Sequence, residues 1–279
     1  MVSNITMEKE LDFIEMEGIL EILNHKFGYD FRDYAKASLL RRVNKFATEN
    51  KISNAYDLKF FLLNTAGAFQ HFLQEITVNV TELFRDPQYY AFLRNQVIPA
   101  LSSYPIIKIW HAGCSTGEEV FSMCILLHEA GLLNRTKIYA TDINPQNIEK
   151  AKKGILPLRA MKDFTANYIN AGGTHDFADY YTARYSHAII HDVLRTPIIF
   201  SQHNLVVDQP FNEFQFISCR NVMIYFNRVL QDRVLQVFYD SLASRGYLGI
   251  GLKETLAFSK VKGLFDTMDG QLKIYRRKA

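Results

Sequence analysis

The hydrophobic positions in the first hundred residues recur with a helical period. Phe69, Phe72, Leu73 and Ile76 follow the spacing i, i+3, i+4, i+7 that an amphipathic helix requires. A second helix is predicted over residues 35–49, where apolar and polar side chains form opposite stripes. No strand-like run interrupts this part of the chain, so we expect it to be helical.

The polar stripe of the helix predicted over 35–49 is basic. It carries Arg41, Arg42 and Lys45, which the helical spacing is expected to direct to the same side. Two interpretations fit this pattern. The stripe is either a solvated face that aids solubility or a surface that attracts an acidic partner.

After Pro105 the pattern changes to short apolar runs that alternate with helical stretches. This alternation is typical of a doubly wound α/β sheet. The predicted strands are Ile106–Ala112, Lys137–Thr141, Ile198–Gln202, Phe214–Ser218, Tyr247–Leu252 and Leu272–Arg276. The predicted helices cover about Thr116–Ala130, the stretch after Asn144-Pro145, and Arg228–Ser244.

Residues 170–197 fit neither pattern. Gly172-Gly173, three tyrosines and Ile189-Ile190 indicate a small β insertion closed by turns. The expected organisation is therefore a helical N-terminal domain over residues 1–80, followed by an α/β domain over 81–279. The β insertion at about 170–197 belongs to the second of these domains.

Composition excludes several classes of protein. The 279 residues include 32 basic and 29 acidic side chains, a net charge of +3 that is too even to indicate nucleic-acid binding. Three scattered cysteines suggest neither a disulfide framework nor a zinc site, and we expect no metal. The N-terminus lacks the pattern of a signal peptide, and no apolar run approaches the ~20 residues of a membrane helix. We expect a reduced, cytoplasmic protein.

Candidate chemistry begins where the first predicted strand leads into a helix. Gly113 and Gly117 lie in this loop, at the position where open α/β sheets bind nucleotides. Neither G-x-G-x-x-G nor the phosphate-loop pattern is present, and two carboxylates, Glu118 and Glu119, follow instead. Acidic side chains suit a cationic ligand such as S-adenosylmethionine better than a pyrophosphate. The alternative is that both glutamates complement the helix dipole.

Asp142 ends the second predicted strand. A carboxylate at this position can accept hydrogen bonds from both ribose hydroxyls of an adenosine. It lies 29 residues after Gly113, which is longer than the usual spacing of about 20, so a turn or cap residue is the alternative.

Two further segments carry polar residues. Thr77–Thr81 alternates polar and apolar positions before Arg85, which can bind a carboxylate. The alternative is that this segment has a structural role. Asp86 is predicted to cap the helix that follows it. The second segment, Phe216–Phe226, brings polar residues to the end of a strand. Its cysteine, Cys219, is interpreted as buried and inert because no Cys–His–Asp pattern accompanies it.

Together these segments resemble the CheR family of chemotaxis methyltransferases, in order over nearly the whole chain. The similar segments are Thr77–Arg85 (T-x-N-x-T-x-F-F-R), Trp110–Ser122 (A-C-S-T-G-E-E-P-Y-S), Ala140–Asn144 (A-T-D-I-D), His203–Leu205 (N-L) and Cys219–Phe226 (C-R-N-V-x-I-Y-F). The departures from the family pattern are Leu83 for phenylalanine, Val120-Phe121 for Pro-Tyr, and Gly251–Glu254 where the family often has G-H-S-E.

The resemblance implies a Rossmann-like, S-adenosylmethionine-dependent methyltransferase domain with a small β-subdomain, after an all-helical domain. It implies S-adenosylmethionine as cofactor and S-adenosylhomocysteine as product. By resemblance, cofactor binding falls to Asn79, Thr81 and Arg85 (methionine end), Gly113, Glu118 or Glu119 (amino acid part), Asp142 (ribose), Asn204 and Leu205 (adenine), and Cys219, Arg220 and Asn221 (pocket closure). Arg85 and Tyr225 are expected at the reacting methyl, and Arg41, Arg42 and Lys45 at the substrate.

The function implied is methyl transfer to glutamate side chains of chemotaxis receptors, which tunes adaptation. The expected partners are the receptor cytoplasmic domain and a receptor C-terminal peptide at the β-subdomain. We expect no nucleic acid, no membrane insertion and a monomeric protein. The alternatives are a methyltransferase that acts on another protein or on a small carboxylic acid, and a non-catalytic cofactor-binding sensor.

Overall fold

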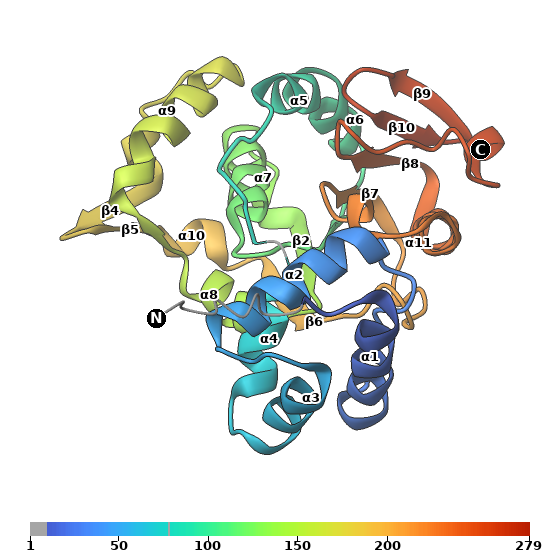
Figure 1. Cartoon of the computed structure of the whole chain (residues 1–279). Helices are drawn as coiled ribbons and strands as arrows, with labels where there is room; N and C mark the ends of the chain where they lie inside the picture. The colour runs from blue at the N-terminus through green and yellow to red at the C-terminus, as the bar shows by residue number, and fades with distance from the viewer. Residues whose placement is uncertain (1–9, 78) are drawn as a thin grey trace. The chain divides into compact units, whose positions relative to one another are not determined.

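The computed structural model describes residues 10–77 and 79–279 (Figure 1). The first nine residues, on which the expectation about a signal peptide rests, and Val78 lie outside the described residues. The chain divides into two compact units, Met1–Val78 with Tyr225–Leu230, and Asn79–Ile224 with Gln231–Ala279. Residues 225–230 therefore belong with the N-terminal unit, although they lie far from it in sequence.

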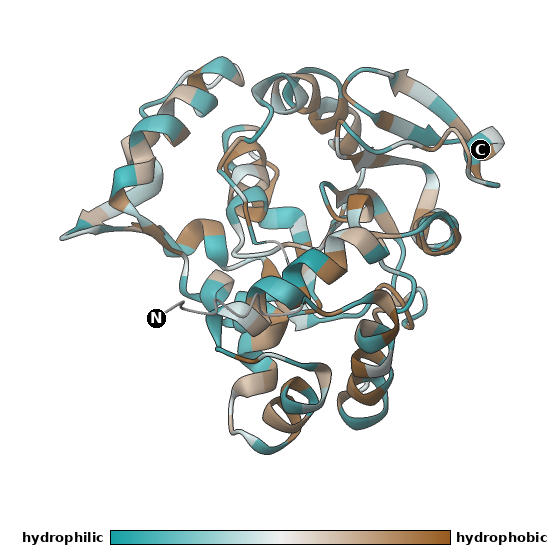
Figure 2. Cartoon of the chain, viewed as in Figure 1, coloured by the Kyte–Doolittle hydropathy of each residue, from teal (hydrophilic) through white to brown (hydrophobic). Residues whose placement is uncertain are grey.

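The N-terminal unit is built from helices. Asp12 and Glu15 form a capping box at the start of the first helix, and Gly28 ends it in a left-handed conformation. The helices are α1 (Phe13–Phe27), α2 (Lys36–Glu49), α3 (Ala55–Asn64) and α4 (Ala68–Ile76). In Figure 2, hydrophobic and hydrophilic residues alternate along α1, as expected for helices with one buried face.

The helical periodicity read from the sequence is confirmed. All four residues of the stripe Phe69–Ile76 are buried in the core, and so are Leu39, Val43 and Phe46 of α2. Of the three basic residues, Arg41 and Lys45 are exposed, whereas Arg42 is half-buried.

The second unit contains a seven-stranded sheet in the order β6-β2-β1-β7-β8-β10-β9. The first five strands of this order run parallel, and β10 is antiparallel to β8 and β9. The strands are β1 (Ile107–Ala112), β2 (Thr136–Asp142), β6 (Ile198–Gln202), β7 (Phe214–Cys219), β8 (Leu242–Ile250), β9 (Phe265–Asp269) and β10 (Ile274–Arg277). The order reverses between β1 and β7, and ligands bind at such a switch point.

Among the described residues of this unit, two α-helices precede β1 in the chain, and five lie between successive strands. The α-helices are α5 (Pro87–Phe92), α6 (Ile98–Leu101), α7 (Glu118–Glu129), α8 (Pro145–Lys153), α9 (Met161–Asn170), α10 (Asp192–Arg195) and α11 (Arg228–Ser241). A π-helical turn, Leu93–Val97, joins α5 to α6. The α/β order predicted from the sequence is confirmed, but the helix predicted to reach Ser244 ends at Ser241, and β9 was not predicted.

A small three-stranded sheet has the order β3-β5-β4, with β3 (Ile155–Pro157), β4 (Tyr181–Arg184) and β5 (His187–Ile190). Both pairings are antiparallel. The strands β4 and β5 lie in the segment 170–197, whereas β3 comes from upstream of it and is separated from β4 by α9.

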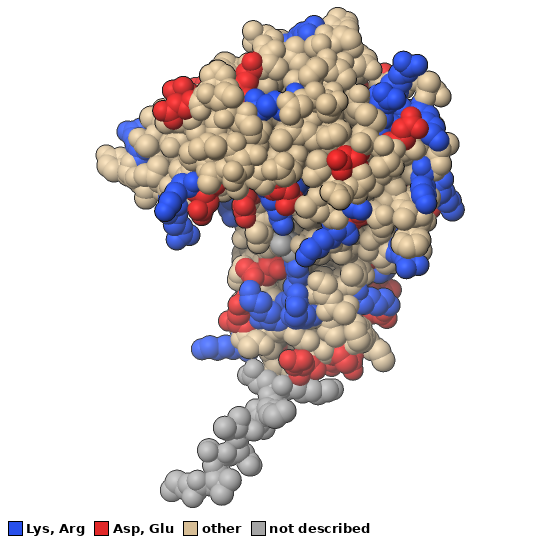
Figure 3. Space-filling model, turned by 90° about the horizontal axis from the view of Figure 1, so that it is seen from above, with Lys and Arg blue, Asp and Glu red and all other residues tan. Residues whose placement is uncertain are grey.

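Charge is mixed on the surface, in keeping with the nearly even composition. On the face shown in Figure 3, Lys and Arg are interspersed with Asp and Glu among a majority of other residues. Over residues 10–77 and 79–279, no helix combines the length and the apolar character needed to cross a membrane.

Candidate active site

The loop after β1 is fixed by two glycines in left-handed conformations. Gly113 has a φ of +76°, and a Cβ atom there would lie 2.4 Å from Cγ2 of Val222. Gly117 has a φ of +96° and stands at the N-cap of α7. Because Val222 follows β7, this close approach brings together the loops after β1 and β7, the two strands at the switch point.

The two glutamates that begin α7 have different environments. Glu119 is engaged at both oxygens. Its Oε1 accepts a hydrogen bond from Ser218 (2.5 Å) and lies 3.0 Å from His111 Nδ1, and its Oε2 pairs with Arg220 (3.2 Å). Burial alone would raise the pKa of Glu119, but the hydrogen bond with His111 and the charge of Arg220 outweigh it and hold the pKa at about 2. Glu119 is therefore ionised and committed to contacts within the protein.

Glu118 keeps acceptor capacity. Its side chain is buried, its Oε2 accepts a hydrogen bond from Thr116 (2.6 Å), and it forms no ion pair within the described residues. Burial raises the pKa of Glu118, and the Thr116 hydrogen bond only partly opposes this. A cation beside this carboxylate would reverse that effect.

Asp142, at the end of β2, joins two loops. Its Oδ2 accepts a hydrogen bond from the Ser115 amide (2.9 Å), and its Oδ1 accepts one from the Asn144 amide (2.9 Å). Burial raises the pKa of Asp142, and these amide bonds only partly oppose it. The carboxylate holds the β1 loop and still has lone pairs for a ligand.

Asn147 was not singled out in the sequence, although it lies in the first turn of α8, five residues after Asp142. It is 1% exposed, and its Nδ2 donates to Asn79 Oδ1 (2.7 Å) and to Asp142 Oδ1 (3.3 Å). Its own Oδ1 is buried and has no hydrogen-bond partner among the described residues. Asn147 therefore connects two predicted cofactor residues, and its buried Oδ1 remains available to a donor.

The segment after Asn79 is irregular. Asn79 and Thr81 are half-buried, whereas Val80 between them is 69% exposed, which agrees with the predicted alternation. Arg85 is half-buried and donates to the Val80 carbonyl (3.1 Å). Asp86 stands at the N-cap of α5, but the expectation that its side chain caps the helix is wrong, because its carboxylate pairs with Arg220 instead.

The loop after β7 is held by a glutamate that sequence analysis noted only as part of a divergent loop. Glu254 is 5% exposed and accepts hydrogen bonds from four backbone amides. The donors are Asn221 (3.3 Å), Val222 (3.0 Å), Ile224 (3.2 Å) and Gly251 (2.5 Å). The divergent residues Leu252 and Lys253 therefore leave this anchor intact.

The remaining predicted cofactor residues at strand ends are Cys219, which ends β7, and Asn204 and Leu205, which follow β6. Cys219 is fully buried, and burial, with the nearby Glu254 charge, raises the pKa of its thiol well above the usual value, so it holds its proton. Asn204 accepts a hydrogen bond from the Val206 amide (3.0 Å), and Leu205 is buried beside it in sequence. Within the described residues, no group of three or more His, Cys, Asp or Glu side chains could hold a metal ion.

Four predicted site residues belong to the other unit. Tyr225 accepts a hydrogen bond from the Ala35 amide (2.8 Å) through its carbonyl, and the Arg42 guanidinium lies 5.0 Å from the centre of its ring. Arg42 also donates to the Ile76 carbonyl (3.0 Å). Lys45 lies 3.4 Å from Glu75 and 3.5 Å from Glu49. Arg41 is exposed.

Comparison with known proteins decides the family. A family model described as CheR methyltransferase, SAM binding domain, matches residues 79–274, and one described as CheR methyltransferase, all-alpha domain, matches residues 14–77. The chain belongs to the CheR methyltransferase family. The resemblance drawn from the sequence is confirmed, and so are the fold class and the cofactor, S-adenosylmethionine.

Proteins with similar sequences are named as methyltransferases. It is 45% identical over 273 residues to a putative methyltransferase Cher3 of Pseudomonas putida, covering 98% of this chain and 100% of that protein. It is 28% identical to a chemotaxis protein methyltransferase of Borreliella burgdorferi, over 92% of each chain. It is 29% identical to a chemotaxis protein methyltransferase of Escherichia coli, over 74% of this chain and 70% of that one.

Proposed function

We propose that this CheR family member transfers the methyl group of S-adenosylmethionine to glutamate side chains of methyl-accepting chemotaxis receptors. The observation that carries the proposal is the match of both CheR domains, in order, over residues 14–77 and 79–274. The competing functions are methylation of another protein or of a small carboxylic acid, and cofactor sensing without transfer. Methyl transfer to a purified receptor cytoplasmic domain separates them.

We assign the contacts with the cofactor to residues of the second unit. Glu118 is the glutamate without an ion-pair partner among the described residues, so it is assigned the α-ammonium group, and Asp142 is assigned the ribose hydroxyls. Asn79, Thr81 and Arg85 hold the methionine end. Asn204 and Leu205 border the adenine, and Cys219, Arg220 and Asn221 close the pocket, with Arg220 contributing through its backbone because its side chain is fully buried.

The chemistry requires no acid or base. When bound, S-adenosylmethionine supplies a methyl group activated by a sulfonium. A receptor glutamate with a pKa of about 4.3 is already ionised at neutral pH. Its carboxylate oxygen attacks the methyl carbon, so that the C–O bond forms as the C–S bond breaks. The carboxylate becomes a neutral ester, the sulfonium becomes a thioether, and no proton moves.

Rate acceleration then depends on alignment and on the exclusion of water. Arg85 and Tyr225 are assigned to orient the incoming carboxylate. The Arg42 guanidinium lies against the ring of Tyr225, and the Ala35 amide holds the Tyr225 backbone through its carbonyl. Arg42 is therefore assigned a positioning role rather than direct contact with the receptor.

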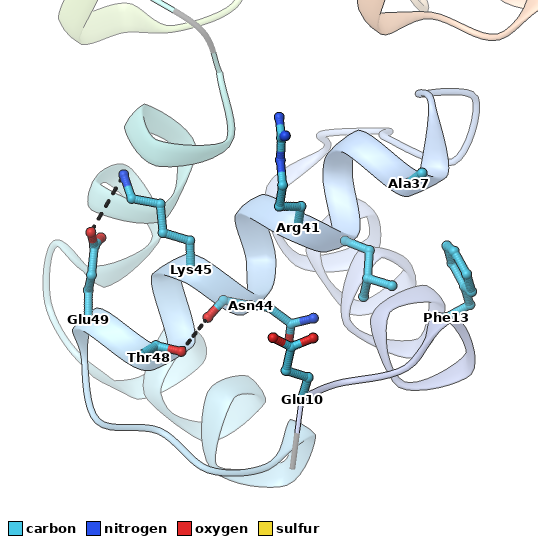
Figure 4. A pocket seen from close by; sticks show the side chains of 9 residues that line it. Glu10, Phe13, Ala37, Arg41, Asn44, Lys45, Thr48 and Glu49 are labelled. Atoms are coloured by element: carbon cyan, nitrogen blue, oxygen red, sulfur yellow. Dashed lines mark hydrogen bonds and ion pairs between the residues drawn. The ribbon is translucent and has the colours of Figure 1, made fainter. Parts of the chain in front are cut away.

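Helix α2 is proposed as the receptor-binding surface. A hollow of about 570 Å³ lies on it and is lined by Arg41, Lys45, Glu49 and apolar residues that include Phe13 and Leu40. In Figure 4, Arg41 extends away from α2, while Lys45 points toward Glu49. Arg42 contacts Tyr225 and Ile76, and Lys45 pairs with Glu49 and Glu75. Of the three basic residues predicted to bind the receptor, Arg41 is therefore the one proposed to contact it directly.

Charge reversal tests this surface. Arg41→Glu is expected to slow receptor methylation several-fold below about 0.1 M salt, where exposed charges act over about 10 Å, and less at higher salt. Affinity for the cofactor should not change. The assay is kcat/KM for receptor across ionic strength. Lys260→Glu is the control, because it changes the net charge equally at a 90% exposed side chain outside α2. Equal rates for both variants at low salt would contradict the assignment.

The β-subdomain is proposed to bind the receptor C-terminal peptide along β4, as an added strand. Hydrogen-bonded pairs alternate along an antiparallel ladder, and the His191 amide donates to the Tyr180 carbonyl (3.1 Å). The N–H of Ala183, three positions along, therefore faces away from β5. The opposite edge, β3, is less suited, because Pro157 has no N–H to donate.

A proline in β4 tests the strand addition. Ala183→Pro is expected to abolish the contribution of the receptor tail to binding, because it removes an outward donor without breaking the β4–β5 ladder. Ala183→Val keeps the N–H and is expected to bind as the parent does. Pull-down with receptor that has or lacks its tail measures this contribution. A tail effect of equal size in both variants, or no tail effect in the parent, would count against β4.

A further inference from the structure

We propose that the side chain of Arg220 is a positioning residue that fastens the Arg85–Asp86 turn in place for methyl transfer. Its Nη2 donates to the Arg85 carbonyl (3.1 Å) and to Asp86 Oδ2 (2.5 Å). The side chain is fully buried, so it has no surface to offer a ligand. This inference rests on the proposed role of Arg85 at the methionine end of the cofactor.

The turn requires such support because its backbone is strained. Phe84 and Asp86, on either side of Arg85, have φ values of 54° and 59°, in the left-handed region that disfavours residues with a side chain. The Phe84 amide donates to Ser122 of α7 (2.8 Å), which holds one end of the turn. Arg220 holds the other end. Arg85 therefore lies between two fixed points.

Arg220 is itself anchored on the opposite side. Its Nη1 pairs with Glu119 Oε2 (3.2 Å), and its guanidinium lies 4.1 Å from the centre of the Tyr89 ring. Glu119 is held in turn by His111 and Ser218. The strand end at β7, the start of α7 and the Arg85 turn are thereby joined through a single guanidinium, whose planar shape makes these contacts simultaneously.

The test compares Arg220→Lys with a control that removes an equivalent guanidinium elsewhere. Arg94 is 21% exposed, pairs with buried Glu129 and donates to the Ala171 carbonyl (3.3 Å), so Arg94→Lys disturbs an arginine with the same kinds of partner in the same unit. Binding of S-adenosylhomocysteine is measured by calorimetry, together with thermal unfolding. Arg220→Lys is expected to weaken binding by about tenfold or more, the size expected for lost hydrogen bonds to charged groups, while Arg94→Lys leaves it unchanged.

A double-mutant cycle shows whether the effect passes through Arg85. If it does, Arg85→Ala with Arg220→Lys binds no more weakly than Arg85→Ala alone. Additive losses, or equal losses in Arg220→Lys and Arg94→Lys, would overturn the proposal. Asp86→Asn provides the same cycle if Arg220→Lys does not fold, because this carboxylate is 30% exposed and its loss is milder. The readout involves no methyl acceptor, so failure here is distinct from failure of the proposed function.

Discussion

The Arg85→Ala variant is expected to lose methyl-transfer turnover by on the order of 100-fold, the effect of losing alignment at a reacting centre. Its fold should survive. Arg85 is half-buried, and its guanidinium donates to the Val80 carbonyl, so its removal leaves no buried ion unpaired. The measurement is the initial rate at saturating cofactor, with thermal unfolding recorded in parallel.

Two companion variants sharpen this result. Arg135→Ala removes an exposed arginine that donates to the Ser102 carbonyl (2.8 Å), and it is expected to keep the parental rate. Tyr225→Phe keeps the ring that faces Arg42 and loses only the hydroxyl, so the rate should fall while cofactor affinity stays nearly unchanged. Parental rates in both Arg85→Ala and Tyr225→Phe would remove these residues from the catalytic assignment.

The second large effect is expected at Asp142. Asp142→Ala should weaken binding of S-adenosylhomocysteine by about 1–3 kcal/mol, the range for losing a charged hydrogen-bond partner. The upper end is expected, because the same carboxylate holds the Ser115 amide and thereby the loop after β1. Calorimetry gives the affinity directly.

Asp142→Asn separates the contact of this carboxylate with the ligand from its support of the loop after β1. One amide oxygen can still accept from Ser115, so the loop keeps part of its support, and the loss of affinity should be smaller than in the alanine variant. Asp163→Ala, at an exposed position in α9, is the control and should bind normally. If Asp142→Ala binds S-adenosylhomocysteine as tightly as Asp163→Ala does, Asp142 does not contact the ribose.

Elements with a strong local signal were predicted closely. The strand at Ile198–Gln202 is found with the predicted bounds, because its apolar run is preceded by a proline that marks its start. Strand β9, Phe265–Asp269, was missed because three of its five residues are polar and it gains its place by pairing with β10. The boundary between α11 and β8 shifted from Ser244 to Ser241, because no glycine or proline separates the two elements there.

The sequence predicts which residues lie at the strand ends, but it does not predict which of them contact other protein groups and which can contact a ligand. Glu118 and Glu119 are adjacent and chemically identical, and only the positions of His111, Ser218 and Arg220 distinguish them. Arg41 and Arg42 present the same problem. Helical spacing placed both on a basic stripe, whereas Arg42 packs against Tyr225, which lies more than 180 residues further along the chain.

Supporting residues were the hardest to find. Asn147 belongs to no motif, and Glu254 is noted only as the last residue of the segment where the family often has G-H-S-E. The roles of both depend on contacts across the fold. Asn147 bridges Asn79 and Asp142, and Glu254 gathers the amides of the β7 loop. Such contacts follow from the sheet order, which local sequence patterns do not encode.

The central claim is that glutamate side chains of a receptor are the methyl acceptors. The most direct test is to incubate the enzyme with S-adenosylmethionine labelled in its methyl group and a purified receptor cytoplasmic domain. We expect label on the receptor that mild alkali releases as methanol, as a carboxylate methyl ester requires, and that is lost with Arg85→Ala. Label that resists alkali, label found only on small carboxylic acids, or cofactor binding without any transfer would contradict the account.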